Sequence, residues 1–304
     1  MKTVFLFVCL LATTALGDYA WIPKPETLTL KAGWEFFKTE NNFDSFGNKN
    51  NLTTNSNPSS LRQNQVLLDL EYGLGEQWSG ILRTGILTAQ VEPTTSGNST
   101  LSGTGLFDTT LGFKWQFKHE KPILALETGL ILPPYSTTNL DPDELALGDG
   151  VSGIVFRLHG GAQVKKFSFS LSPGLLFRFG RFSHQALLDA AVSVTLKKVY
   201  FRLFQSSQFS MTKDPSTGQS SENLEPGSAG SFSRIALNPD LMSLGLKVGT
   251  FLSPRFKLES WFSQTLWGHT AADGFRVGLA LITNLDFSTP DNREHVTEVP
   301  LNGE

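Results

Sequence analysis

Apolar and polar residues alternate along much of this chain with a period of two, which is the repeat of a β-strand. The segment from Phe107 to Lys118 shows it best: every second residue from Phe107 onward is apolar or threonine, and the residues between them are polar or glycine. A helix would spread these aromatic side chains around its whole circumference. We therefore expect an amphipathic strand here.

The same alternation recurs from one end of the chain to the other and predicts about twelve strands of about ten to thirteen residues. That length and even number are typical of a bacterial outer-membrane barrel. The alternation is clear in residues 65–74, 167–179 and 275–287, and weaker in 27–40, 78–90, 122–132, 151–163, 184–196, 199–210, 240–251 and 256–267.

The segments between these strands alternate in length, although the link at 180–183 is short where a long one is expected. Short periplasmic turns and longer extracellular loops would give this layout. Both termini of the chain would then lie on the periplasmic side. The tight links are 75–77, 119–121, 164–166, 197–198 and 253–255. The longer segments, rich in Asn, Ser, Thr, Gly, Pro and Asp, are 41–61, 91–106, 133–150, 211–231 and 268–274.

A soluble β-sandwich is the competing fold, because its strands also alternate. Aromatic residues near the ends of many apolar strand faces favour the membrane barrel, where they form interfacial girdles. We therefore predict an all-β, antiparallel transmembrane barrel. The residues of the expected girdles are Trp34, Phe36, Trp78, Trp115, Phe117, Phe177, Phe179 and Trp267.

The N-terminal residues 1–17 resemble a secretory signal peptide, with a basic start, an apolar run too short to span a membrane and small residues before Asp18. Cleavage there would remove Cys9, so the mature chain would hold no disulfide or cysteine metal site. Residues 18–26 contain two prolines and form either a small hatch in the lumen or a loose periplasmic lead. The barrel is expected over 27–287, followed by a polar tail, 288–304.

Composition agrees with a barrel and excludes one class of partner. Only 17% of residues are charged, against roughly 25% in a typical globular protein, and the chain has 24 Phe. A formal net charge of -3 gives no basic surface for nucleic acid.

If the apolar faces meet lipid, the opposite faces define a lumen whose charged side chains have both signs. Two interpretations stay open: a charged constriction that selects solutes, or ion pairs that hold a narrow barrel together. The candidate lumen-lining residues are Asp69, Glu71, Arg83, Lys114, Glu127, Arg157, His159, Arg178, Arg202, Lys247, Glu259 and Arg276.

No catalytic site, metal site or cofactor is predicted. A lipid hydrolase needs a serine and a histidine on one outward face, and adjacent residues such as Ser183 and His184 point to opposite faces. No HxxxH or calcium-loop pattern appears. The acidic segment 141–144 is expected to be a solvated loop, with a divalent ion or lipopolysaccharide as the alternative.

Several ordered segments resemble the outer-membrane channels associated with meta-pathway phenol degradation, relatives of the long-chain fatty acid and aromatic hydrocarbon channels. They are EYGL at 71–74, GLFDTTLGFK at 105–114, the apolar strand 122–134 with LGDG at 147–150, NP at 238–239, LSPR at 252–255 and GFR at 274–276. Phe107 stands where the family usually has glycine. Phe287 fits the family's terminal aromatic residue, although a polar tail follows it.

The resemblance implies an outer-membrane channel for the passive uptake of small molecules, hydrophobic or aromatic ones among them. Outer-membrane lipid, lipopolysaccharide, the barrel-assembly machinery and a small solute would then be its partners. A structural or surface-interaction barrel with a plugged lumen is the alternative, and a lipid-modifying enzyme is the third hypothesis.

Overall fold

The computed structural model describes residues 20–43, 46–51, 59–93, 101–134, 147, 150–180, 183–212, 240–253, 255–269 and 271–288. The expected signal peptide, the acidic segment 141–144 and the tail beyond residue 288 lie outside these ranges. No helix among the described residues is long and apolar enough to cross a membrane.

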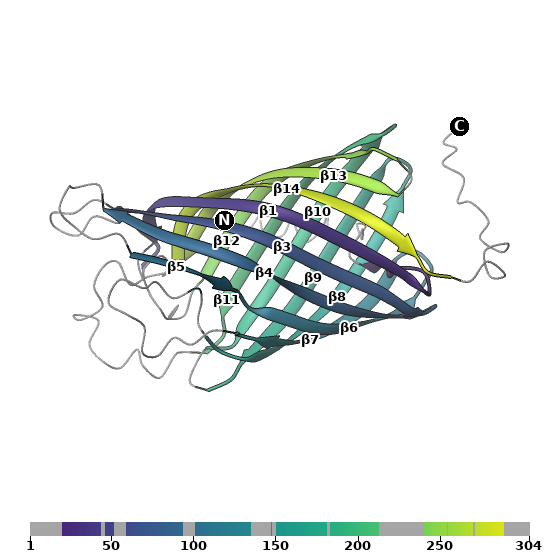
Figure 1. Ribbon diagram of the computed structural model, residues 1–304, viewed down its shortest axis with the longest axis horizontal. Coiled ribbons are helices and arrows are strands. Elements are labelled where there is room, and N and C mark those ends of the chain that lie inside the picture. The colour runs from purple at the N-terminus through teal and green to yellow at the C-terminus, as the bar shows by residue number, and fades with distance from the viewer. Residues whose placement is uncertain are drawn as a thin grey trace.

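Fourteen strands form one antiparallel sheet that closes on itself, because β1 pairs with both β3 and β14 (Figure 1). The strands are β1 (Thr27–Phe43), β2 (Lys49–Asn51), β3 (Ser59–Gly75), β4 (Trp78–Pro93), β5 (Leu101–Leu106), β6 (Thr109–Lys118), β7 (Ile123–Leu132), β8 (Gly153–Val164), β9 (Phe167–Arg178), β10 (Gln185–Leu196), β11 (Val199–Ser210), β12 (Asp240–Phe251), β13 (Phe256–His269) and β14 (Ala271–Asp286).

The wall itself has twelve strands. Short β5 and β6 both pair with β4, one beyond the other, and together occupy one position in the wall. The three-residue β2 is an addition that pairs only with the end of β1. The predicted twelve-stranded antiparallel barrel is therefore confirmed.

The expected strand 107–118 is wrong at its start, because β5 ends at Leu106 and β6 begins at Thr109. The backbone N–H of Phe107 donates to the carbonyl of Gly85 at 3.2 Å, and a Cβ added at Gly85 would lie 2.5 Å from the Phe107 ring. Gly85 shares the lumenal face of β4 with Arg83, so Phe107 turns inward instead of pointing to lipid. Glycine on the neighbouring strand gives the ring the space to do so.

Several expected loops are partly strand. β3 begins at Ser59, inside the expected loop 41–61, and β13 and β14 cover all but residue 270 of the expected loop 268–274. β2 and β5 also lie within expected loops. Backbone pairing continues where both faces are polar, so strands extend beyond the part that shows apolar alternation.

The tight links lie at one end of the barrel. The first residue of β1 and the last residue of β14 lie side by side at the same end (Figure 1). Thr27 pairs with Asp286, and the N–H of Phe287 donates to the carbonyl of Glu26 at 2.9 Å. The ends therefore meet on the side expected to be periplasmic.

The wall is apolar outside and polar inside. Leu111, on the outward face of β6, is 48% exposed, whereas Ser172, on the inward face of β9, is 1% exposed. Outward aromatic rings also pack on one another: Trp78 stacks on Phe113 and Trp115 at centroid distances of 4.7 and 5.3 Å. This distribution reverses that of a water-soluble protein and suits a wall surrounded by lipid.

Candidate functional site

A buried carboxylate, Glu127 on β7, is the centre of one lumenal network. Its side chain is 1% exposed and accepts two hydrogen bonds from Arg83 on β4, at 2.6 and 3.0 Å. Arg83 also lies 3.5 Å from Asp69 on β3, and His159 Nε2 on β8 lies 3.1 Å from Glu127. The network therefore joins strands on either side of β6.

Further ion pairs extend this network around the wall. Lys114 on β6 donates to both carboxylate oxygens of Glu71 on β3 at 2.9 Å, and Ser79 donates to the same carboxylate at 2.6 Å. Arg157 on β8 pairs with Asp189 on β10 at 2.5 Å. Because the pairs link strands that are not neighbours, they brace this part of the wall.

Ser172, His159 and Glu127 form a hydrogen-bonded series that resembles a hydrolase triad in residue type. Ser172 Oγ lies 2.8 Å from His159 Nδ1, and His159 Nε2 faces Glu127. All three side chains are buried, and Glu127 is also held by Arg83. A nucleophile has to reach its substrate, so we interpret the series as a brace. Sequence reasoning missed it because only the register reveals it.

A second carboxylate, Glu259 on β13, is surrounded by lysines. Lys257, Lys247 and Lys31 place their ammonium groups 2.8, 3.1 and 3.9 Å from its oxygens, and the Tyr200 hydroxyl also donates to it. Glu259 is 3% exposed. One negative charge therefore faces three positive charges.

Beside this cluster, Glu35 on β1 accepts a hydrogen bond from Trp261 Nε1 at 3.0 Å and lies 3.5 Å from Arg276 Nε on β14. Arg202 on β11 donates to Ser193 Oγ at 2.9 Å. We call this part of the lumen the positive wall, because its five cations outnumber its two carboxylates. It consists of Lys31, Glu35, Arg202, Lys247, Lys257, Glu259 and Arg276.

Inward aromatic rings on this side lie against glycines of the next strand. A Cβ added at Gly278 would stand 2.1 Å from the Trp261 ring, and one at Gly245 would stand 2.3 Å from the Phe204 ring. Tyr200 lies over Gly249 in the same way. The glycines allow the rings to lie flat on the wall, which leaves the space beside them to the lumen.

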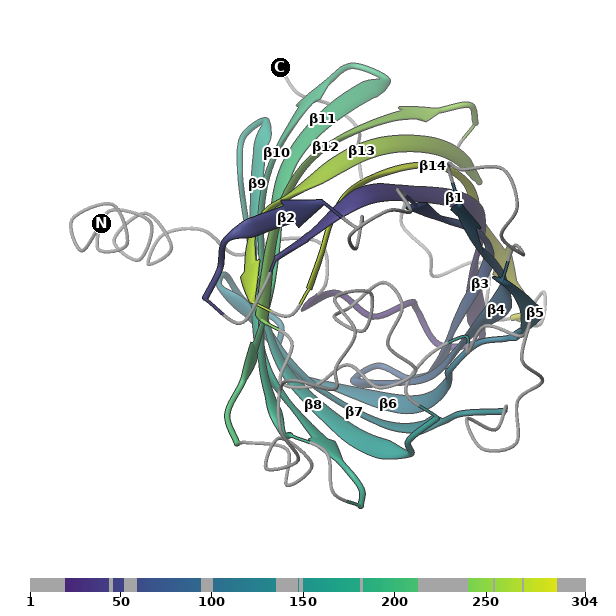
Figure 2. The same ribbon diagram turned by 90° about the vertical axis from the view of Figure 1, so that its left-hand side faces the viewer.

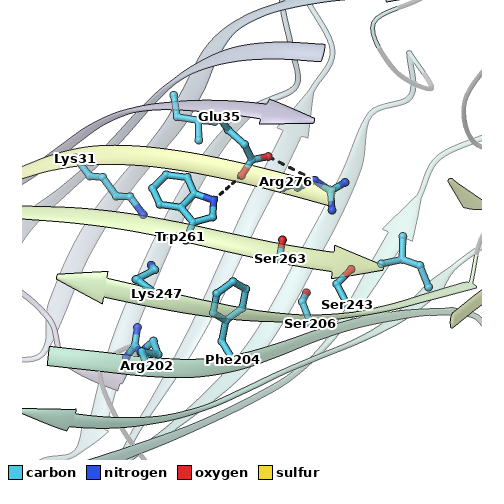
Figure 3. Close-up of a pocket in the computed structure, with 12 residues that line it drawn as sticks. Lys31, Glu35, Arg202, Phe204, Ser206, Ser243, Lys247, Trp261, Ser263 and Arg276 are labelled. Carbon is cyan, nitrogen blue, oxygen red and sulfur yellow. Dashed lines mark hydrogen bonds and ion pairs between the residues drawn. The ribbon is translucent and has the colours of Figure 1, made fainter. Parts of the chain in front are cut away.

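A cavity of about 340 Å³ lies along the positive wall and is lined by residues of β1, β3 and β11 to β14 (Figure 3). Figure 3 shows Lys31, Lys247 and Arg202 toward one end of it, Trp261 and Phe204 in the middle, and Ser206, Ser243 and Ser263 toward the other end. The volume is at the lower end of the roughly 300–1,000 Å³ of ligand pockets, which suits a small solute.

Eleven of the twelve expected lumen residues belong to the two networks. Arg178, at the end of β9, instead donates to the carbonyl and hydroxyl oxygens of Ser183 at 2.8 and 2.6 Å. Sequence reasoning missed Lys31, Glu35, Asp189, Lys257 and Trp261. The sequence does place Lys31 and Glu35 on the strand face opposite Trp34, which is the polar face. The alternation in that strand is weak, so the two residues were not selected.

Among the residues that the structure describes, no group of three or more His, Cys, Asp or Glu side chains could hold a metal ion.

Residues 20–26 lie inside the barrel at the end where β1 begins. The N–H of Ile22 donates to Gln116 Oε1 at 3.2 Å, and that of Glu26 donates to the Gly73 carbonyl at 2.9 Å. Figure 2, which looks along the barrel, shows the purple segment that precedes β1 within the outline of the wall. These contacts hold residues 22 and 26 against the wall at this mouth of the barrel.

Deleting residues 20–23 should raise the single-channel conductance of the reconstituted barrel, because a polypeptide segment would leave the mouth of the lumen. Planar-bilayer recordings measure the change, and a deletion of residues 301–304 provides a control of equal length. An unchanged conductance would show that the segment does not restrict the mouth.

No family model matches the sequence, and no curated protein matches it. Among solved structures, an outer-membrane channel from Pseudomonas putida F1 is 14% identical, with a TM-score of 0.60, and the match covers 88% of this chain and 98% of that chain. The CymD monoaromatic hydrocarbon channel is 9% identical, with a TM-score of 0.43 and coverage of 87% and 90%. A FadL homologue from Pseudomonas aeruginosa is 10% identical, with a TM-score of 0.41 and coverage of 88% and 92%.

The likeness to the Pseudomonas putida channel extends over nearly the whole of that protein. It shows that this chain has the fold of an outer-membrane β-barrel, as the sequence resemblance implied. Because the identity is 14%, the likeness establishes the fold alone.

Proposed function

We propose that this protein is a passive channel of the bacterial outer membrane that takes up small solutes. The carrying observation is the cavity beside the positive wall, because it lies inside a closed barrel whose outward face is apolar. The solved structure from Pseudomonas putida F1, which has a similar fold, is described as an outer membrane channel. Outer-membrane lipid, lipopolysaccharide and the barrel-assembly machinery would be its other partners.

The location is tested by fractionation. We expect the mature protein in outer membranes, with a gel mobility that changes on boiling because the closed barrel resists detergent until it is heated. Recovery as a soluble periplasmic protein would contradict the proposal.

Channel function is tested by reconstituting the refolded, full mature chain in planar bilayers. We expect discrete conductance steps and uptake of small solutes into liposomes. A folded barrel that passes neither ions nor solutes would instead support the alternative, a structural or surface-interaction barrel with a plugged lumen. The ion pairs around Glu127 and the contacts of residues 20–26 are the observations that favour this alternative.

The enzyme hypothesis rests on the Ser172–His159–Glu127 series. We propose that it has no hydrolytic role, because Ser172 is 1% exposed and Arg83 holds the carboxylate. Hydrolysis of phospholipids that a Ser172→Ala variant loses would overturn this proposal.

A further inference from the structure

The cationic end of the cavity has an excess of positive charge. Lys31 and Lys247 both lie over the Trp261 ring, 5.4 and 5.6 Å from its centroid, and Figure 3 shows Arg202 on the same side of the cavity. The two lysines share the carboxylate of Glu259 with Lys257. Four cations line the cavity, against one lining carboxylate, Glu35, and one beside it, Glu259. A lumenal surface on which cations outnumber carboxylates attracts anions.

The opposite end of the cavity contains a buried hydroxyl without a partner. Ser243 is 4% exposed, lines the cavity, and its Oγ forms no hydrogen bond. Buried polar groups are nearly always hydrogen-bonded, and an exception calls for an explanation such as a bound group. Ser263 lines the same end, so a polar group of a solute would find hydroxyls there (Figure 3).

Between the two ends, the cavity wall is flat and aromatic. The Phe204 ring lies over Gly245 and the Trp261 ring over Gly278, and both line the cavity. Aromatic rings that lie flat favour a planar apolar body, which they contact by offset stacking or edge-to-face packing.

We propose that this cavity binds a small aromatic carboxylate. The carboxylate lies among Lys31, Lys247 and Arg202, the ring packs on Phe204, and a ring hydroxyl reaches Ser243. The inference rests on the proposed channel function and names the class of solute that the lumen selects. The charge distribution distinguishes this class from uncharged hydrocarbons, which have no carboxylate to pair with the cations.

Titration calorimetry on the refolded full mature barrel in detergent tests the site directly. We expect para-hydroxybenzoate to bind at least about tenfold more tightly than para-hydroxybenzyl alcohol, because charge-assisted hydrogen bonds to the carboxylate are lost in the neutral compound. Equal binding of the two compounds, or no binding of either, would overturn the proposal.

Two lysine variants separate a specific site from a general charge effect. Lys247 and Lys257 both pair with Glu259, but only Lys247 lines the cavity. We expect Lys247→Gln to weaken para-hydroxybenzoate binding about tenfold and Lys257→Gln to weaken it much less. Equal losses would mean that net charge, not this cavity, attracts the anion.

Ser243→Ala tests the contact that we propose between the solute hydroxyl and the serine end of the cavity. It should weaken the binding of para-hydroxybenzoate and leave that of benzoate unchanged, because benzoate has no hydroxyl to place there. If the variant binds para-hydroxybenzoate as tightly as the native protein, the assigned orientation is wrong.

Bilayer recordings on the same protein keep the two proposals apart. Conductance without carboxylate binding would retain the channel and overturn the site. Binding without conductance would retain the site and overturn the channel.

Discussion

Glu127→Ala should destabilise the barrel by about 1–2 kcal/mol, because it removes the buried acceptor of Arg83 and His159, while water partly compensates Arg83, whose side chain is 37% exposed. Arg83 would lose its two hydrogen bonds at 2.6 and 3.0 Å and retain only Asp69 at 3.5 Å. His159 would lose a partner as well. Denaturant unfolding in micelles, followed by tryptophan fluorescence, measures the change in the free energy of unfolding.

Two further variants control this experiment. Glu127→Gln keeps the size and one acceptor oxygen, so it should cost less than Glu127→Ala. The double variant Arg83→Leu/Glu127→Leu should recover much of the loss, because apolar residues of similar volume can replace a buried pair. The free energy of unfolding usually changes by no more than about 0.5 kcal/mol for a surface substitution. A change that small for Glu127→Ala would show that the pair does not brace the wall.

Gly278→Ala should both destabilise the barrel and lower its conductance. The new Cβ would lie 2.1 Å from the Trp261 ring, which would have to leave the wall and enter the lumen. Trp261 would also give up its hydrogen bond to Glu35. We expect a loss of about 1–3 kcal/mol, the usual cost of inserting a methyl group into a packed region, together with smaller single-channel currents.

Gly80→Ala is the matched control, because the nearest atom to its new Cβ is Leu74 Cδ1 at 3.7 Å, an ordinary contact. Adding Trp261→Ala to Gly278→Ala should restore the conductance by removing the displaced ring. Native currents in Gly278→Ala alone would show that the ring does not limit the lumen.

The sequence predicts the wall well because each strand contacts an apolar and a polar medium at once, which imposes a period of two. Strand β11 begins at Val199 and ends at Ser210, as expected. The start of β3 could not be predicted, because residues 59–65 lack the apolar alternation on which the prediction depends. The inward direction of the Phe107 side chain could not be predicted either, because it depends on Gly85, which is distant in sequence.

The same alternation predicts which charged residues share the polar face of each strand, but it does not predict their partners. Asp69 and Arg83 are direct neighbours in the register of β3 and β4, so their pairing follows once the hairpin is known. Arg83 and Glu127 are separated by β6, and their contact depends on strand tilt and side-chain length. The cavity depends on the same three-dimensional details.

The pairing of Thr27 with Asp286 has a consequence for the order of assembly. The first and last strands of the wall hydrogen-bond to each other along sixteen register positions, so closure brings together the most distant parts of the chain. Until β14 arrives, β1 is an open edge that can pair with another chain and aggregate. Contacts of such long sequence separation form slowly. Any truncation before Ala271 would leave that edge permanently open, so a shortened chain should be cleared or aggregate rather than form a smaller pore.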